Sequence, residues 1–292
     1  MESKSQIGND YLINSNKAEN VKFLFDKKEF KIIKSNNICG LNYSDYVEFT
    51  DKEILKEGFL DVLEKNLILS KVAQIYFRLI PLVENKKDRE KTLILLEKKN
   101  LKVKQNFSMF INLREKTENL RKNLRKSYKS LINKEKRKNK ILFSNQKIFN
   151  EKHFNDWINL YNSALLRGGK KLDIESIKIK EKALKNNDIL ISLAYDEKNL
   201  LGGMTFNINK YYASYSAAAN NTIIEKDRSR GVGHLLLWEA ILELKRSKHS
   251  FLDLGSFGEN IQNEKLKNIN KFKRGFGPHE LITNYFEKSL YV

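Results

Sequence analysis

The chain has 292 residues, of which 40% are hydrophobic and 11% aromatic, so it is long and apolar enough to fold with one large or two smaller cores. Its formal net charge is +19, from 55 Lys and Arg against 36 Asp and Glu. This balance favours an acidic partner, such as nucleic acid, a phosphorylated substrate or an anionic membrane surface. Codon bias is an alternative source of the basicity, since Lys, Asn and Ile are all abundant.

Several classes of protein are excluded at this stage. A single cysteine, Cys39, allows no internal disulfide framework and no thiolate metal cluster. The histidines His153, His249 and His279 are too scattered to suggest a metal site. No apolar run approaches the ~18 residues of a membrane span, and the polar start has no apolar stretch typical of a secretory signal. We therefore expect a cytoplasmic protein with no bound metal.

The first part of the chain alternates between strand and helix patterns. Residues 1–20 are expected to form a polar tail, and residues 21–118 the first of two α/β halves. Helical spacing of apolar residues covers 52–70 and 88–100. Strand-like segments cover 21–25, 30–33, 72–80 and 101–113.

A basic segment follows at residues 119–140. Between Arg121 and Lys140 there are ten Lys or Arg and one acidic residue, Glu135. Leucines, a tyrosine and an isoleucine recur at helical spacing inside it, so we predict one amphipathic basic helix connecting the two halves. A solvated connector is the alternative, but the size of the cluster favours contact with an anionic partner.

Residues 141–292 are expected to form the second half. The patterns predict helices at 150–166, 174–185 and 234–246, and strands at 140–143, 189–195, 200–208, 211–218 and 251–254. Short turns join the strands from 189 to 218, so these three should form an antiparallel meander.

A loop rich in Arg and Gly lies between the third of these strands and the next helix. Its residues are Arg228, Arg230, Gly231, Val232, Gly233 and His234. Glycines at a helix start let the backbone approach a ligand, and the free N–H groups there favour an anion. Arginines beside them can contact the same oxygens. The spacing Arg-x-x-Gly-x-Gly resembles the pyrophosphate loop of the GNAT acyltransferase superfamily, which implies that these residues bind acyl-CoA. A chance surface turn is the alternative.

Near the C-terminal end, Phe272 and Phe276 are interleaved with basic residues in the segment 271–278. Such a segment could clamp a substrate by stacking, or it could be a basic turn held to the core by its two phenylalanines.

The order of these motifs resembles the FemABX-type peptidyl and aminoacyl transferases, a branch of the GNAT superfamily, over residues 40–290. The matching segments are Leu120–Lys129, Gly233–Ile241, Leu252–Gly255, Phe272–Gly277, Tyr43–Tyr46 and Phe77–Pro81. The resemblance implies an α/β (α+β) fold of tandem GNAT-like halves, with mixed, mostly antiparallel sheets flanked by helices. It also implies action on amines of cell-envelope precursors, and the family's peptidoglycan members take an amino acid from aminoacyl-tRNA.

The resemblance also suggests roles for single residues. Lys273 is expected to contact the donor carbonyl or its oxyanion, and a cation suits that charge. Asp253 and Asp45 are candidate bases or amine-orienting carboxylates, although either could cap a turn. The residues assigned to substrate binding are Arg125, Lys126, Arg78, Phe272 and Phe276. The chain shows neither a Ser-His-Asp pattern nor a reactive-cysteine context, so we expect direct attack without an acyl-enzyme.

The sequence thus predicts an N-acyltransferase that acts on an amine of a phosphorylated, nucleotide-linked or lipid-linked amino-sugar or peptide acceptor in cell-envelope or surface-glycan synthesis. The Arg/Gly loop favours acyl-CoA, such as acetyl-CoA, as co-substrate. The basic segment favours the alternative, an aminoacyl-tRNA-dependent peptidoglycan bridge transferase. A further alternative is a non-catalytic RNA-binding protein. Peripheral contact with an anionic membrane is compatible with each of these functions.

Overall fold

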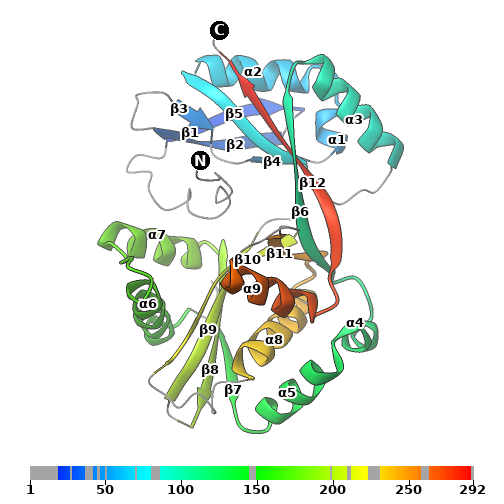
Figure 1. Ribbon diagram of the computed structural model, residues 1–292. Helices are drawn as coiled ribbons and strands as arrows, with labels where there is room; N and C mark the ends of the chain where they lie inside the picture. Colours follow the sequence, from blue (N-terminus) through cyan, green and yellow to red (C-terminus); the bar gives the residue numbers. More distant parts are fainter. Residues whose placement is uncertain are drawn as a thin grey trace. The chain divides into compact units, whose positions relative to one another are not determined.

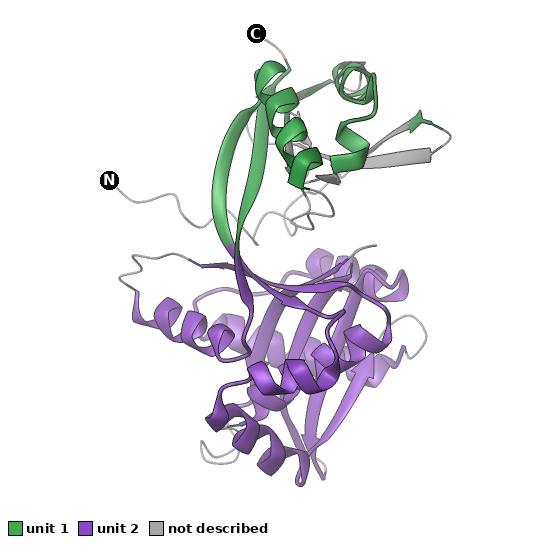
Figure 2. Ribbon diagram, turned by 90° about the vertical axis from the view of Figure 1, so that its right-hand side faces the viewer, with its two compact units in different colours: residues 1–107, 281–292 green, residues 108–280 purple. Residues whose placement is uncertain are grey.

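The structure is a computed structural model that describes residues 19–26, 28–36, 42–44, 47–49, 51–69, 71–79, 86–144, 149–197, 199–208, 212–222, 231–257 and 263–290. The chain forms two compact units (Figure 2). Unit 1 contains residues 1–107 and 281–292, and unit 2 contains residues 108–280. The basic segment 119–140 lies inside unit 2, and the end of the chain belongs to unit 1. The boundaries of the two units therefore differ from those of the halves 21–118 and 141–292 expected from the sequence.

Unit 1 is a sheet with helices packed on it (Figure 1). Its strands are β1 (Glu19–Phe25), β2 (Lys28–Asn36), β3 (Asn42–Ser44), β4 (Val47–Phe49) and β5 (Val72–Leu79), and its helices are α1 (Asp51–Ile54), α2 (Phe59–Leu69) and α3 (Lys86–Lys98). Two long strands, β6 (Lys102–Asn112) and β12 (His279–Ser289), each have residues in both units. The strand order is β1-β2-β3-β5-β12-β6, with β4 paired to β5.

The single helix predicted over residues 52–70 is in fact two helices. Gly58 lies between α1 and α2 with φ +75°, a left-handed backbone that favours glycine and ends regular helix. The core of unit 1 forms where α2 covers the sheet, and Phe77 of β5 stacks on Phe286 of β12 with ring centroids 5.1 Å apart.

Unit 2 has a mixed sheet with helices on both faces (Figure 1). Its strands are β7 (Lys140–Ser144), β8 (Ile189–Asp196), β9 (Asn199–Ile208), β10 (Tyr212–Asn220) and β11 (Phe251–Phe257). Its helices are α4 (Thr117–Asn123), α5 (Lys126–Lys136), α6 (Glu151–Leu166), α7 (Ile174–Lys185), α8 (Val232–Arg246) and α9 (Glu264–Arg274). The strand order is β6-β11-β10-β9-β8-β7, and the predicted antiparallel meander β8-β9-β10 is confirmed. The α/β class, a mixed sheet flanked by helices, is also confirmed.

Two adjacent glycines in β9 allow helices to pack closely on opposite faces of this sheet. A Cβ on Gly203 would lie 2.8 Å from Cε3 of Trp157 in α6, and a Cβ on Gly202 would lie 3.3 Å from Cγ1 of Val232 in α8. Because successive strand residues face opposite sides, α6 and α8 cover different faces. The start of α8 is thereby fixed directly on the sheet.

The basic segment is likewise two helices rather than the one predicted. Leu124, between α4 and α5, is extended with φ −63° and ψ 140°. The next residue, Arg125, donates its backbone N–H to the carbonyl oxygen of Gly275 at 2.9 Å. The break therefore lets the chain bond to the C-terminal turn of α9.

Candidate active site

The candidate site lies where two parallel strands of unit 2 separate. Strands β10 and β11 pair over three residues, from Tyr212 with Phe251 to Ser214 with Asp253, and both continue beyond this point. A β-bulge interrupts the pairing of β10 with β9 between Tyr215 and Ala217, and bulges bend and twist the strand that carries them. Carboxyl ends of parallel strands that part in this way commonly bind ligands.

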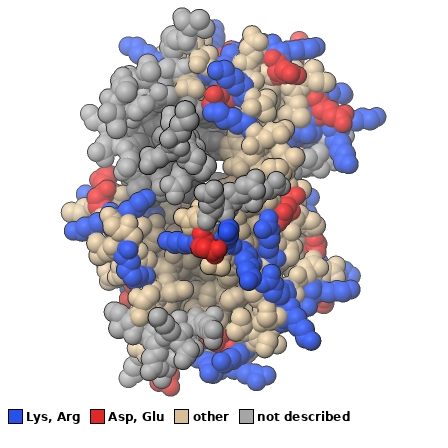
Figure 3. Space-filling view, viewed as in Figure 1, with Lys and Arg blue, Asp and Glu red and all other residues tan. Residues whose placement is uncertain are grey.

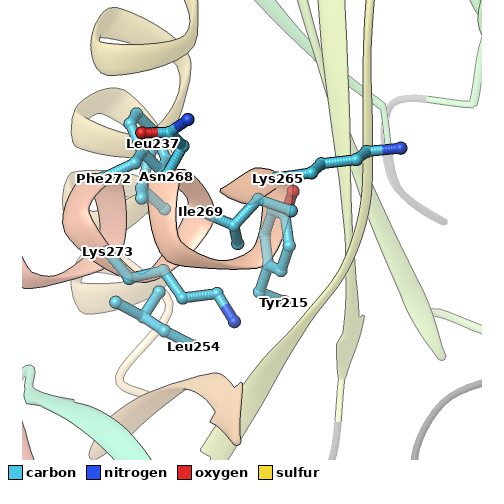
Figure 4. Close-up of a pocket in the computed structure, with 8 residues that line it drawn as sticks. All are labelled: Tyr215, Leu237, Leu254, Lys265, Asn268, Ile269, Phe272 and Lys273. Carbon is cyan, nitrogen blue, oxygen red and sulfur yellow. The ribbon is translucent and has the colours of Figure 1, made fainter. Parts of the chain in front are cut away.

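A pocket of about 490 Å³ occupies this position (Figure 4). Tyr215 of β10 and Leu254 of β11, the first residues after the last pair, form part of its wall. The remaining lining residues come from α8 and α9: Leu237, Lys265, Asn268, Ile269, Phe272 and Lys273. The lining of the pocket is therefore mostly apolar and includes the side chain of Lys273.

Lys273 places its amine inside the pocket, near the ring of Tyr215 and beside Leu254 (Figure 4). Its Nζ is 6.0 Å from the Tyr215 ring centroid, and a Cβ on Gly255 would lie only 3.5 Å from it. Burial lowers the pKa of Lys273, and the charge of Asp253 opposes that shift. A cation held in such surroundings interacts strongly with any charge that develops beside it.

Asp253 acts on this amine through its charge, which partly offsets the lowering of the pKa of Lys273 by burial. It is 3% exposed, and its Oδ1 accepts a hydrogen bond from the backbone N–H of Gly255 at 2.7 Å. Gly255 has φ +87°, so this short turn needs a glycine. Asp253 does not line the pocket, and its position suits the support of Lys273 better than contact with a substrate. The other predicted carboxylate, Asp45, lies outside the described residues.

Tyr215 is a site residue that the sequence did not single out. Burial, with a smaller contribution from Tyr161, raises the pKa of Tyr215 to about 12. Its phenol therefore stays protonated at neutral pH and can donate a hydrogen bond. The sequence offers no signal for this role, because the residue lies in an ordinary Tyr-, Ser- and Ala-rich strand.

A cluster of four aromatic rings holds α5, α8 and α9 together. Tyr128 of α5 lies 4.2 Å from His234 and 5.4 Å from Phe276, while Phe272 lies 5.3 Å from Phe276, all between ring centroids. Phe276 is 3% exposed, whereas Phe272 also lines the pocket. Burial lowers the pKa of His234, whose Nδ1 has no hydrogen-bond partner among the described residues. His234 and Phe276 thus have packing roles, and Phe272 connects this packing to the pocket.

The start of α8 is the described part of the predicted phosphate-binding loop. Gly231 is its N-cap, Val232 is buried, and Gly233 has open surroundings, since a Cβ there would meet nothing nearer than Met204 Cε at 3.7 Å. At Gly231 the space is filled, because a Cβ would lie 2.5 Å from Cγ of Glu135. Arg228 and Arg230 lie outside the described residues.

Comparison with known proteins identifies the fold. No family model matches the sequence, and no curated protein matches it. The crystal structure of FemX is similar with a TM-score of 0.71 and 11% identity, over 94% of this chain and 88% of that chain. The C-terminal domain of a putative lysylphosphatidylglycerol synthetase from Agrobacterium fabrum is similar with a TM-score of 0.57 and 10% identity, over 88% and 80% of the two chains. L-PGS from Bacillus licheniformis follows at 0.55 and 11%, over 92% and 83%. The chain therefore has a FemX-like fold.

Unit 2 carries a cationic surface on α4 and α5. Arg125 and Lys126 are exposed there, the first with its guanidinium 5.4 Å from the Tyr128 ring centroid. Figure 3 shows Lys and Arg gathered over the region where α4 and α5 lie in Figure 1. Lys136 pairs with Glu239 of α8 at 2.8 Å, and most other basic side chains of these helices have no acidic partner among the described residues. The surface therefore remains available to a polyanion.

Arg78 belongs to unit 1, whereas the residues described above belong to unit 2. It lies in β5, is 6% exposed, and has its guanidinium 5.9 Å from the Tyr285 ring centroid. The structure therefore brings Lys273, Asp253 and Phe272 together in unit 2, with Arg125 and Lys126 on the surface of the same unit. A role for Arg78 in substrate binding stays a prediction.

Two further expectations concern metal sites and membrane-spanning helices. Within the described ranges, no cluster of three or more His, Cys, Asp or Glu has metal-site geometry. Over the same ranges, no helix combines the length and apolar character that crossing a bilayer requires.

Proposed function

We propose that the protein transfers an acyl group from an activated donor to an amine, in the pocket between β10 and β11. The amine of Lys273 inside this mostly apolar pocket is the observation that carries the proposal. Attack of the acceptor amine on the donor carbonyl forms the C–N bond and places a negative charge on the carbonyl oxygen. The ammonium of Lys273 stabilises that oxyanion, and the bond to the leaving group then breaks.

Asp253 and Tyr215 assist in different ways. The charge of Asp253 opposes the effect of burial on Lys273, and so favours the ammonium that the oxyanion requires. The protonated phenol of Tyr215 is suited to donate a hydrogen bond to the departing oxygen. The proton that the acceptor amine loses balances the proton that the leaving group gains, so no further reactant is needed.

An aminoacyl ester, as in aminoacyl-tRNA, is the donor that we favour. The cationic α4 and α5 suit the phosphate backbone of an RNA, and the buried Glu135 stands beside the helix start where a CoA diphosphate would otherwise bind. Acyl-CoA is the second candidate, and the Arg228-x-x-Gly231-x-Gly233 spacing supports it.

The acceptor in this proposal is the amine of a nucleotide-linked or lipid-linked amino sugar or peptide used in cell-envelope or surface-glycan synthesis. The exposed Arg125 and Lys126 suit its phosphates. The same surface suits peripheral contact with an anionic membrane in the case of a lipid-linked acceptor.

The test is transfer of a radiolabelled acyl group by the purified full chain. One set of reactions contains total tRNA charged with labelled amino acids, a second contains labelled acetyl-CoA, and each receives nucleotide-linked amino sugars or peptides as acceptors. Lys273→Met removes the oxyanion-stabilising charge and should lower the transfer rate by about 10²–10³-fold. Lys271→Met is the matched control, since this exposed lysine of the same helix does not line the pocket.

Each result has a definite meaning. Transfer from charged tRNA that depends on Lys273 and not on Lys271 supports the proposal. Transfer from acetyl-CoA alone would replace the proposed donor by the second candidate. Binding of tRNA without transfer from either donor would favour the RNA-binding alternative, and equal activity of the two variants would refute the role of Lys273.

A further inference from the structure

Glu135 is a buried acidic residue in a segment whose other charged residues are all basic. It is the single acidic residue between Arg121 and Lys140, and it is 5% exposed while most basic side chains of that segment are exposed. Burying a carboxylate is costly unless nearby dipoles or hydrogen bonds compensate it. The surroundings of Glu135 therefore need an explanation.

Its side chain reaches the N-terminal end of α8. A Cβ on Gly231 would lie 2.5 Å from Cγ and 3.1 Å from Oε1 of Glu135, so this side chain occupies the space that a larger residue would take. Its Oε2 accepts a hydrogen bond from Nδ2 of Asn139 at 2.7 Å. One carboxylate oxygen is thus held by Asn139, and the other lies beside the first residue of the helix start.

The start of α8 attracts negative charge. The backbone N–H groups of His234 and Leu235 donate to the carbonyl oxygen of Gly231, whereas those of Val232 and Gly233 precede the first helical bonds. Gly231, the N-cap residue, has no side chain of its own that could accept from these N–H groups. The positive end of the helix dipole stabilises Glu135, as it would stabilise a bound phosphate.

A diphosphate at this helix start would meet a fixed negative charge only a few ångströms away. We propose that Glu135 is a specificity-determining residue, which excludes donors that carry a diphosphate, such as CoA, from the N-terminus of α8. The inference rests on the proposed acyl transfer, and it supplies a physical basis for the proposed choice of an aminoacyl ester over CoA. The exposed Lys and Arg side chains of α4 and α5 can still bind a polyanion, such as an RNA, that does not reach the N-terminus of α8.

The experiment is calorimetric titration of CoA and of ADP into the full chain. Glu135→Gln keeps the size of the side chain and an oxygen that can accept from Asn139, but removes the charge. It should bind both ligands at least about tenfold more tightly than the wild type, because a unit charge at this range changes binding by that order. Glu239→Gln is the control, since it removes a carboxylate that pairs with Lys136 between the same two helices, two turns further along α8.

Glu135→Met is a second variant that keeps the volume beside Gly231, and thermal unfolding shows whether each variant folds. A gain in affinity in both Glu135 variants and none in Glu239→Gln supports the inference. Folded variants without a gain, or loss of folding in both, would assign Glu135 to stability alone and overturn it, while the transfer assay still decides the donor independently. Tight CoA binding by the wild type would overturn both the exclusion and the proposed choice of donor.

Discussion

Replacing Gly275 with alanine should destabilise unit 2, although the backbone of this residue suits alanine well. Gly275 has φ −65° and ψ −13°, so alanine alone would favour the end of α9 by about 0.5–1 kcal/mol. Its Cβ would, however, lie 2.0 Å from Cε2 and 2.3 Å from Cζ of Tyr128. That ring is enclosed by His234, Phe272 and Phe276 and has little room to move. Overpacking costs about 1–3 kcal/mol, so after the gain from alanine is subtracted we expect a net loss of about 1 kcal/mol.

Urea unfolding followed by tryptophan fluorescence measures this change selectively. The chain has two tryptophans, Trp157 and Trp238, and both belong to unit 2, so the signal reports this unit. Gly233→Ala is the control and should lose no stability, because its Cβ would make only ordinary contacts and alanine favours helix. The reasoning is refuted if Gly275→Ala is as stable as the wild type, or if it loses as much stability in a Tyr128→Leu background, where the clash is relieved.

Three further predictions concern charge and burial. Lys273→Met should stabilise unit 2 at neutral pH. Burial lowers the pKa of Lys273 in the folded state below its unfolded value of 10.5, so between these two pKa values the unfolded state binds more protons and the stability of the wild type rises with pH. The stability advantage of Lys273→Met should therefore shrink over this pH range. Urea unfolding at several pH values measures this, and a stability difference that stays constant with pH would contradict it. His234→Gln should make the protein less sensitive to acid. Burial lowers the pKa of His234 in the folded state below 6.5, so wild-type stability is lost as the pH falls from 6.5 through the folded pKa. Equal loss of thermal stability at low pH in the wild type and in His234→Gln would count against this prediction. Asp51→Asn should destabilise unit 1 by about 3 kcal/mol, since Asp51 pairs with Arg89 at 2.8 Å and both side chains are nearly buried; unchanged hydrogen exchange in unit 1 would exclude this.

Local patterns were sufficient for much of unit 2. Two strands of the meander, β8 and β9, were predicted because each is an apolar run bounded by a turn, and β10 because a Tyr- and Ala-rich run follows them. The helices α6 and α8 were predicted because their apolar residues repeat at helical spacing. These signals require only neighbours in the sequence. The type and order of these elements therefore followed directly from the residues.

Other features depend on residues far away in the chain. No glycine or proline marks the break at Leu124, which forms where Arg125 bonds to Gly275. The helix α9 was missed because it is mostly charged and has only Asn270 fully buried. The strand β12 was missed because its partner β5 lies about two hundred residues earlier.

The candidate site was predictable only where a family motif covered it. Lys273 was named from such a motif, and the structure places its amine in the pocket. Tyr215 and Glu135 were not named as site residues, because their roles arise from burial and from neighbours on other elements. The roles of Asp45, Arg228 and Arg230, which lie outside the described residues, stay predictions.

The path of the chain between the units bears on the order in which the protein folds during synthesis. Unit 2 is one continuous segment, residues 108–280, inserted between the two parts of unit 1. Strand β5 of unit 1 pairs with β12, so its sheet and the stacking of Phe77 on Phe286 are completed only after all of unit 2 has left the ribosome. Unit 2 should thus fold first, while the edge of β5 waits unpaired. A nascent chain stopped before β12 would present a finished unit 2 attached to an unfinished unit 1, and that intermediate is the form that chaperones and proteases would meet.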